Sequence, residues 1–153
     1  MLFLLFQLGE DRYAIEATKI VAVLPLISPK LLPQAPAAVA GVFDYGGEAV
    51  PLIDLSQLAL GRSARPRHST RVLVVNYPMA DGDVRYLGLI AEQAVETMAC
   101  DPDEFDASGV TQDDVRYLGP VTSHPRGLLQ WVRIEHLLPE SVRDLLFKEQ
   151  VDS

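Results

Sequence analysis

The chain has 153 residues, a length that suits one domain with a sizeable core. Apolar residues make up 48% of it and charged residues 22%, which is typical of a globular protein and excludes a disordered chain. The formal charge of −8 argues against a general nucleic-acid binder and against a protein that binds anionic membranes.

The first predicted elements are two short strands. Residues 2–8 are almost wholly apolar, residues 9–12 form a polar turn, and residues 13–15 return as a second strand. The apolar opening is too short for a membrane span, which needs about 20 residues, and it lacks the basic residues of a signal peptide. Together with the single cysteine, Cys100, this predicts a cytoplasmic protein without membrane insertion.

Residues 16–24 fit a helix or a strand by spacing, and we expect a brief turn at 16–19 followed by a strand. Prolines make residues 25–38 irregular. The Gly46-Gly47 pair then predicts a tight hairpin, because glycine adopts positive φ without steric cost. Pro51 has no N–H for a ladder, so the second strand should be an edge strand or bulged there. A helical turn should follow at 55–60, closed by Gly61.

The second half of the chain predicts further strands at regular spacing. We expect strands at 71–77, at 84–90 and on toward Met98, at 115–121 and at 128–134. An acidic loop should occupy 101–114, and a helix at about 139–149 carries an apolar stripe of Val142, Leu145 and Leu146. These elements indicate a mainly β protein of barrel architecture, in one domain over 1–153, with a subdomain boundary near 61–71.

The residue types that carry chemistry form no catalytic pattern. His68, His124 and His136 are far apart and have no partner at metal-ligand spacing. Cys100 has no histidine or cationic cluster beside it that would activate the thiol. The acidic residues that start at Asp101 fail the spacing of a calcium loop. We therefore predict no metal, no cofactor and no enzyme activity.

Two groups of residues remain as candidate binding sites. A basic loop is either solvated or a docking patch for an acidic partner; its members are Arg62, Arg65, Arg67 and Arg71. The aliphatic positions Leu4, Ala17, Ile20 and Val23 are core by default.

Short motifs also occur in a fixed order along the chain. They are Phe6-x-Leu8-Gly9, Ile20-Val21-x-Val23-Leu24, Gly41-Val42, Val50-Pro51-Leu52-Ile53-Asp54-Leu55, Gly88-Leu89-Ile90 and Gly127-Leu128-Leu129-Gln130-Trp131-Val132. This ordered set resembles the pattern of CheW-like domains over about residues 3–138. The opening and the Gln130-Trp131 pair are similar in particular to adaptors of Wsp-type surface-sensing pathways.

The resemblance implies two small SH3-like five-stranded β-barrel subdomains that share a core, with a C-terminal helix. It also implies an adaptor that links the cytoplasmic tip of a methyl-accepting chemoreceptor to the regulatory domain of a CheA-type histidine kinase at membrane receptor arrays. In this interpretation some of the four aliphatic positions face a receptor-binding groove. The turn signature falls on Gly41, Asp44, Gly46, Gly47, Pro51 and Asp54.

Four positions depart from the family pattern, one of them Glu92, where the family has aspartate. Asp44 stands where the family usually has asparagine, and Gly46 where it usually has arginine. Ala22 lies near a position where the family commonly has an acidic residue. In the family the arginine and the acidic residue should form an ion pair. Because both are absent here, neither charge is left without its partner. The alternatives are a small-ligand-binding β-barrel, which needs an enclosed pocket, and a CheW-like regulator of a non-motility pathway.

Overall fold

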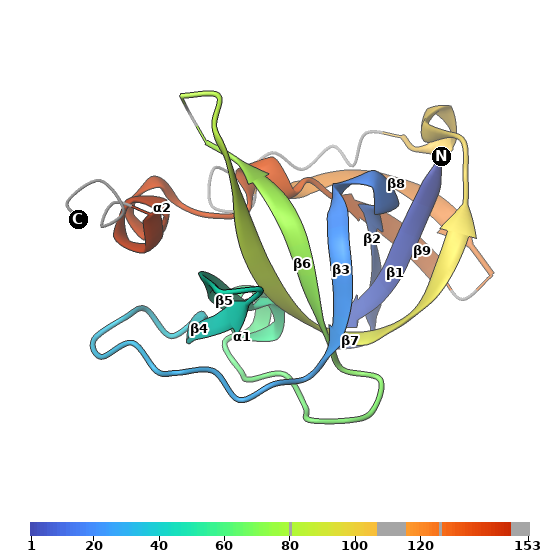
Figure 1. Ribbon diagram of the computed structural model, residues 1–153. Helices are drawn as coiled ribbons and strands as arrows, with labels where there is room; N and C mark the ends of the chain where they lie inside the picture. Colours follow the sequence, from blue (N-terminus) through green and yellow to red (C-terminus); the bar gives the residue numbers. More distant parts are fainter. Residues whose placement is uncertain (80, 107–115, 126, 148–153) are drawn as a thin grey trace.

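The computed structural model of the chain describes residues 1–79, 81–106, 116–125 and 127–147. Strands dominate these residues (Figure 1): β1 (Leu2–Leu8), β2 (Asp11–Glu16), β3 (Ile20–Pro25), β4 (Val39–Tyr45), β5 (Glu48–Asp54), β6 (Arg71–Pro78), β7 (Val84–Ala99), β8 (Leu118–His124) and β9 (Gly127–Val132). The α-helices are α1 (Leu55–Leu60) and α2 (Glu140–Phe147), and the 3-10 turns are η1 (Ala17–Lys19), η2 (Pro102–Glu104) and η4 (Ile134–His136).

The long strand β7 belongs to two groups of strands. Its first half pairs with β6 and β5, and β3 and β4 complete the β3–β7 group. Its second half pairs with β1, and β2, β9 and β8 complete the β1–β9 group. The expected mainly β fold is confirmed, whereas closure of each group into a barrel stays a prediction. The groups meet in β7, and the 61–71 loop lies between α1 and β6 of the β3–β7 group, so the subdomain boundary near 61–71 stays a prediction.

Three clusters of buried side chains match this arrangement. The largest, here called the central core, takes residues from both groups, among them Leu4 and Leu73. A second cluster lies in the β1–β9 group, where the rings of Phe3 and Trp131 meet edge to face at 5.1 Å. A third surrounds Phe43 in the β3–β7 group. Because the largest core belongs to neither group alone, we expect the domain to unfold as one unit.

The predicted hairpin is present between β4 and β5. Gly46 and Gly47 both have positive φ, at 59° and 90°, and the Asp44 carboxylate accepts a hydrogen bond of 2.9 Å from the Gly47 amide. Pro51 lies opposite Val42, whose own amide and carbonyl bond instead with Lys30, at 2.9 and 2.8 Å. The β4–β5 ladder therefore needs no N–H at position 51, where proline has none. The ladder between β5 and β7 begins only at Leu52.

The expected strand boundaries in the last third of the chain were wrong by a few residues. Residue 115 lies outside the described residues, and β8 begins at Leu118, directly after Tyr117, which is buried in the central core. The Tyr117 carbonyl accepts a bond of 2.7 Å from the Arg133 amide. The next strand ends at Val132, since Ile134 already begins the 3-10 turn.

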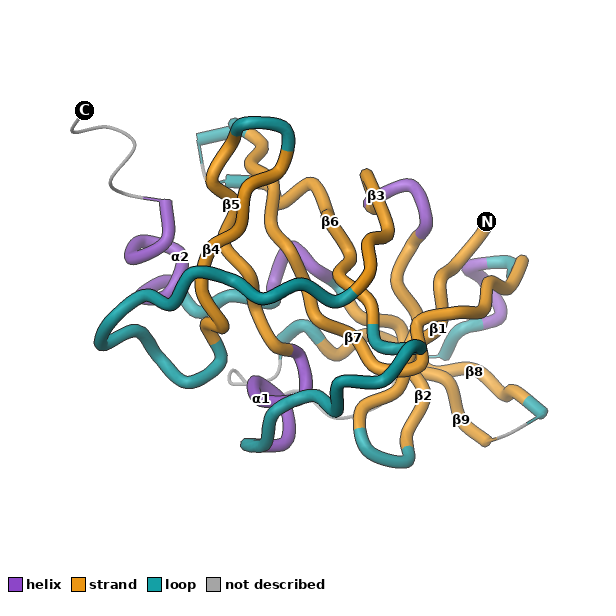
Figure 2. Tube along the Cα trace, turned by 60° about the horizontal axis from the view of Figure 1, so that its bottom comes forward, coloured by secondary structure: helices purple, strands orange, loops and turns teal. Residues whose placement is uncertain are grey.

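The C-terminal helix is present, and its apolar stripe differs from the predicted one. Val142 and Leu146 pack against the central core, but Leu145 is 50% exposed and Phe147 is the buried member. Phe147 stacks on Tyr77 at 6.2 Å. Residues 148–149 lie outside the described residues. The connection from β3 to β4 runs past α2 (Figure 2), and an apolar surface hollow of about 470 Å³ lies between them.

Candidate functional site

The strand β3 is a terminal strand of its sheet. Among the described residues its ladder runs to β6 alone, so its other backbone edge is unpaired. Its side chains alternate between half-buried and exposed positions, and the exposed ones include Val21 and Val23, at 40% and 48%. Exposed apolar side chains on a free strand edge mark a surface that a partner can cover.

A register shift in β3 decides which residues share a face. Ile20 lies opposite Val75 and Val23 lies opposite Leu73, with the shift between Ile20 and Ala22. Directly opposed residues point to the same side of a sheet, and Val75 and Leu73 both belong to the central core. Ile20 and Val23 therefore face the same side, although their odd spacing would separate them in a regular strand.

The four predicted groove residues differ in exposure. Leu4 is 7% exposed and belongs to the central core, the default interpretation of the sequence, so it cannot offer its side chain to a partner. Ala17, in η1, and Ile20 are half-buried, and Ile20 packs against the central core. Val23 is the only one of the four whose side chain is exposed. Val21 was missed by sequence reasoning, although the alternation of the strand could have indicated it.

The other face of β3 carries Ala22, one of the positions where the resemblance implies a departure from the family pattern. Ala22 packs against the cluster around Phe43, together with Tyr45 and Tyr86. The rings of Tyr45 and Tyr86 meet edge to face at 5.6 Å. Apolar and aromatic packing thus occupies the region beside Ala22, while Gly46 is exposed at the hairpin tip.

Asp54 holds the segment that follows the hairpin. It is 7% exposed, and its carboxylate accepts hydrogen bonds from the amides of Ser56, Gln57 and Ala64, at 3.0, 3.2 and 2.9 Å. The first two bonds cap α1, and the third fixes the loop that carries the arginines. The predicted close at Gly61 is confirmed, with φ of 73° and a bond from its amide to the Gln57 carbonyl.

The comparisons with known proteins agree with this fold. The sequence model described as the CheW-like domain matches residues 2–142. The chain belongs to the CheW-like domain family. The chemotaxis protein CheW of Helicobacter pylori (strain ATCC 700392 / 26695) is 36% identical over 76 residues, which are 49% of this CheW-like chain and 46% of that protein. The chain thus matches about half the length of this curated relative.

The fold of this CheW-like domain is also that of a solved structure. The scaffolding protein TtCheW from Thermoanaerobacter tengcongensis superposes with a TM-score of 0.79, over 92% of this chain and 89% of its own, at 18% sequence identity. Agreement over nearly the whole of both chains shows that the two share their architecture.

The Asp54 cap of this CheW-like domain supports a stability prediction. Asp54→Ala removes the acceptor of three backbone amides, and we expect it to lower the free energy of unfolding by about 2–3 kcal/mol. Asp44→Ala is the matched control, because this exposed carboxylate accepts one amide bond only and its loss should cost less than about 1 kcal/mol. Urea unfolding measures both, and equal losses would contradict the anchoring role of Asp54.

The described part of this CheW-like domain holds no clustered metal ligands and no activated thiol. No three histidine, cysteine or acidic side chains gather there as metal ligands. Burial, and then the Glu104 carboxylate 2.9 Å from its sulfur, raise the pKa of Cys100 to about 11, so its thiol stays protonated at neutral pH. None of the described helices has the length and apolar content of a membrane span.

Proposed function

We propose that this CheW-like domain is an adaptor that couples a methyl-accepting chemoreceptor to a CheA-type histidine kinase in chemotaxis-like signalling. Membership of the CheW-like family supports this proposal. The observation that carries it is the open face of β3, where Val23 is 48% exposed beside the half-buried Ile20. Such a face binds a partner and supplies no catalytic group, so we propose no enzyme activity.

The receptor tip packs against the Val23 face of β3, the terminal strand of the β3–β7 group. The regulatory domain of the kinase is itself CheW-like. One of its strand groups packs against a strand group of this protein, at one end of this protein's domain. Receptor state then biases kinase state through contacts that differ between the two states of the assembly. Interfaces of about 1,200 Å² or less and micromolar affinity, about −8 kcal/mol, are sufficient when an array adds avidity.

Co-sedimentation with receptor-bearing vesicles tests the proposal. Vesicles that carry a chemoreceptor cytoplasmic fragment are mixed with the kinase, with and without this protein. We expect the kinase to pellet with the vesicles in far larger amount when the protein is present, because one domain holds both partners. Equal kinase in the two pellets, with the protein itself remaining in the supernatant, would contradict the adaptor role.

We also propose that this adaptor serves a receptor of its own, in a pathway that need not drive motility. Ala22 and Gly46 replace the charged pair that the family pattern implies, so the surface near β3 is more apolar. A receptor that relies on that pair should discriminate against this chain. A competition pull-down against a CheW protein that has the pair measures this, and equal retention by general chemotaxis receptors would refute it.

A further inference from the structure

We propose that residues 61–71, here called the arginine loop, form a docking site for an acidic segment of a partner protein. The loop holds Arg62, Arg65, Arg67 and Arg71, four of the 13 lysines and arginines of the chain. It contains none of the 21 acidic residues. An anionic protein thus concentrates positive charge in one short segment, which favours a partner of the opposite sign at that place alone.

The backbone of the arginine loop is held in place by the strands beneath it. The Ala64 amide donates to Asp54 at 2.9 Å, and the Arg65 amide donates to the Glu92 carboxylate at 3.0 Å. Near the other end, the Ser69 carbonyl accepts a bond of 3.0 Å from the Ala94 amide. Because these bonds fix the loop before a partner arrives, binding costs little backbone entropy.

The guanidinium groups of the arginine loop have no acidic partner within the described residues. The ion pairs found there join Arg12 to Glu96 and Arg85 to Asp83. Two of the described acidic residues are hydrogen-bonded to the loop, and their carboxylates bond with its backbone amides. Asp54 accepts from the Ala64 amide, and Glu92 accepts from the Arg65 amide and the Ser56 hydroxyl. Arg65 and Arg67 are exposed. Carboxylates from another chain can therefore make charge-assisted hydrogen bonds with them.

A surface pocket of about 430 Å³ beside the arginine loop indicates which side chains the partner segment should carry. Its apolar walls are Pro25, Leu26 and Pro66, and its polar lining is Arg67, His68, Thr70 and Arg71. An apolar side chain can fill such a pocket while a neighbouring carboxylate meets the arginines. The pocket thus fits a segment in which leucine or a similar residue lies beside aspartate or glutamate.

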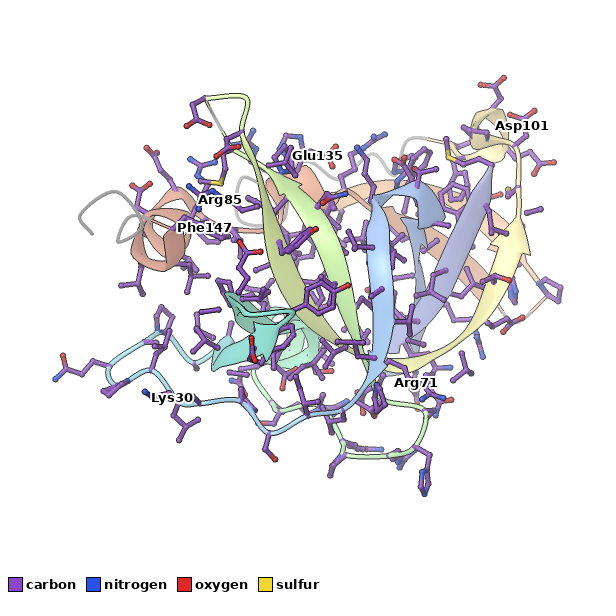
Figure 3. All side chains as sticks on the ribbon, in the orientation of Figure 1. Lys30, Arg71, Arg85, Asp101, Glu135 and Phe147 are labelled. Atoms are coloured by element: carbon purple, nitrogen blue, oxygen red, sulfur yellow. The ribbon has the colours of Figure 1, made fainter. Side chains whose placement is uncertain are left out.

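A protein segment fits this loop better than the other anionic candidates. A nucleic acid would extend beyond the loop over a surface that is acidic overall, with a formal charge of −8 on the chain. A second copy could place its Asp101 turn on the loop, because Asp101, at the upper right of Figure 3, lies apart from Arg71, near the bottom of the view. Two bodies that each carry −8 repel one another, however, which disfavours that occupant.

Fluorescence anisotropy of a labelled peptide tests the proposal. The probe is a short peptide of glutamate and leucine, and its competitor is the same peptide with glutamine for glutamate. We expect the substitution R65Q/R67Q to weaken binding of the probe about tenfold, because two exposed charge-assisted contacts are lost. The control is K30Q/R85Q, which removes the same charge elsewhere (Figure 3) and should change affinity by less than about twofold.

A charge-reversal variant keeps the test independent of folding. The triple variant R62E/R65E/R67E leaves one positive and three negative charges in the loop, so it should lose the acidic probe and gain a peptide of lysine and leucine, whereas a misfolded variant would bind neither. Equal loss in R65Q/R67Q and K30Q/R85Q would overturn the proposal, as would preferential binding of an oligonucleotide over the acidic peptide. Self-association in sedimentation that R65Q/R67Q abolishes would also overturn it, in favour of a second copy.

Discussion

Replacing Val23 by aspartate is expected to weaken receptor binding strongly while the domain stays folded. The side chain is 48% exposed on the terminal strand β3, so the substitution should lower the free energy of unfolding by less than about 1 kcal/mol. At the proposed interface the same carboxylate would be desolvated without a partner, which should weaken binding by about tenfold or more. Pull-down with a chemoreceptor fragment and a urea unfolding curve measure the two effects.

Two further substitutions make this experiment decisive. Val95→Asp changes a residue of the same type that is 59% exposed on β7, and it should bind the receptor normally. Ile20→Asp should lose both binding and stability, because Ile20 packs against the central core. If Val23→Asp unfolds the domain, or if it binds the receptor as well as Val95→Asp does, the β3 face is not the receptor site.

Gly41→Ala is expected to be the most destabilising of the substitutions considered for this chain. Gly41 has φ of 143°, and a Cβ at this position would overlap the Lys30 carbonyl oxygen and lie 2.9 Å from its carbonyl carbon. Backbone atoms cannot move aside as a flexible side chain can, so the Lys30–Val42 bonds should break. We expect a loss of about 3 kcal/mol in the free energy of unfolding, or roughly 10 °C in Tm.

Gly47→Ala separates the close contact from the backbone conformation. Gly47 also has a positive φ, at 90°, but no atom lies within 4 Å of where its Cβ would be. We expect this control to cost about 1 kcal/mol, the strain of the turn alone. Thermal unfolding followed by circular dichroism compares the two. A Gly41→Ala variant as stable as Gly47→Ala would show that the connection from β3 to β4 can move away.

Local sequence signals determined much of the fold. Three elements depend on residues that are neighbours in the chain. They are the Gly46-Gly47 turn, the helical turn capped by Asp54 and closed by Gly61, and the strand that begins at Arg71. The physics of these elements is short-ranged, being turn conformation, helix capping and alternation. The order of motifs also identified the family, because it needs no knowledge of which residues meet in space.

The tertiary structure alone decided which candidate residues can meet a partner. The register shift in β3 brings Ile20 and Val23 to one face, and packing between the strand groups buries Leu4 but leaves Val23 open. The sequence allows the arginine loop to be either a solvated segment or a docking patch, and it cannot show that Asp54 and Glu92 hold the loop from two different strands. Register, burial and these long-range bonds depend on strands that pair across the chain, so no local pattern encodes them.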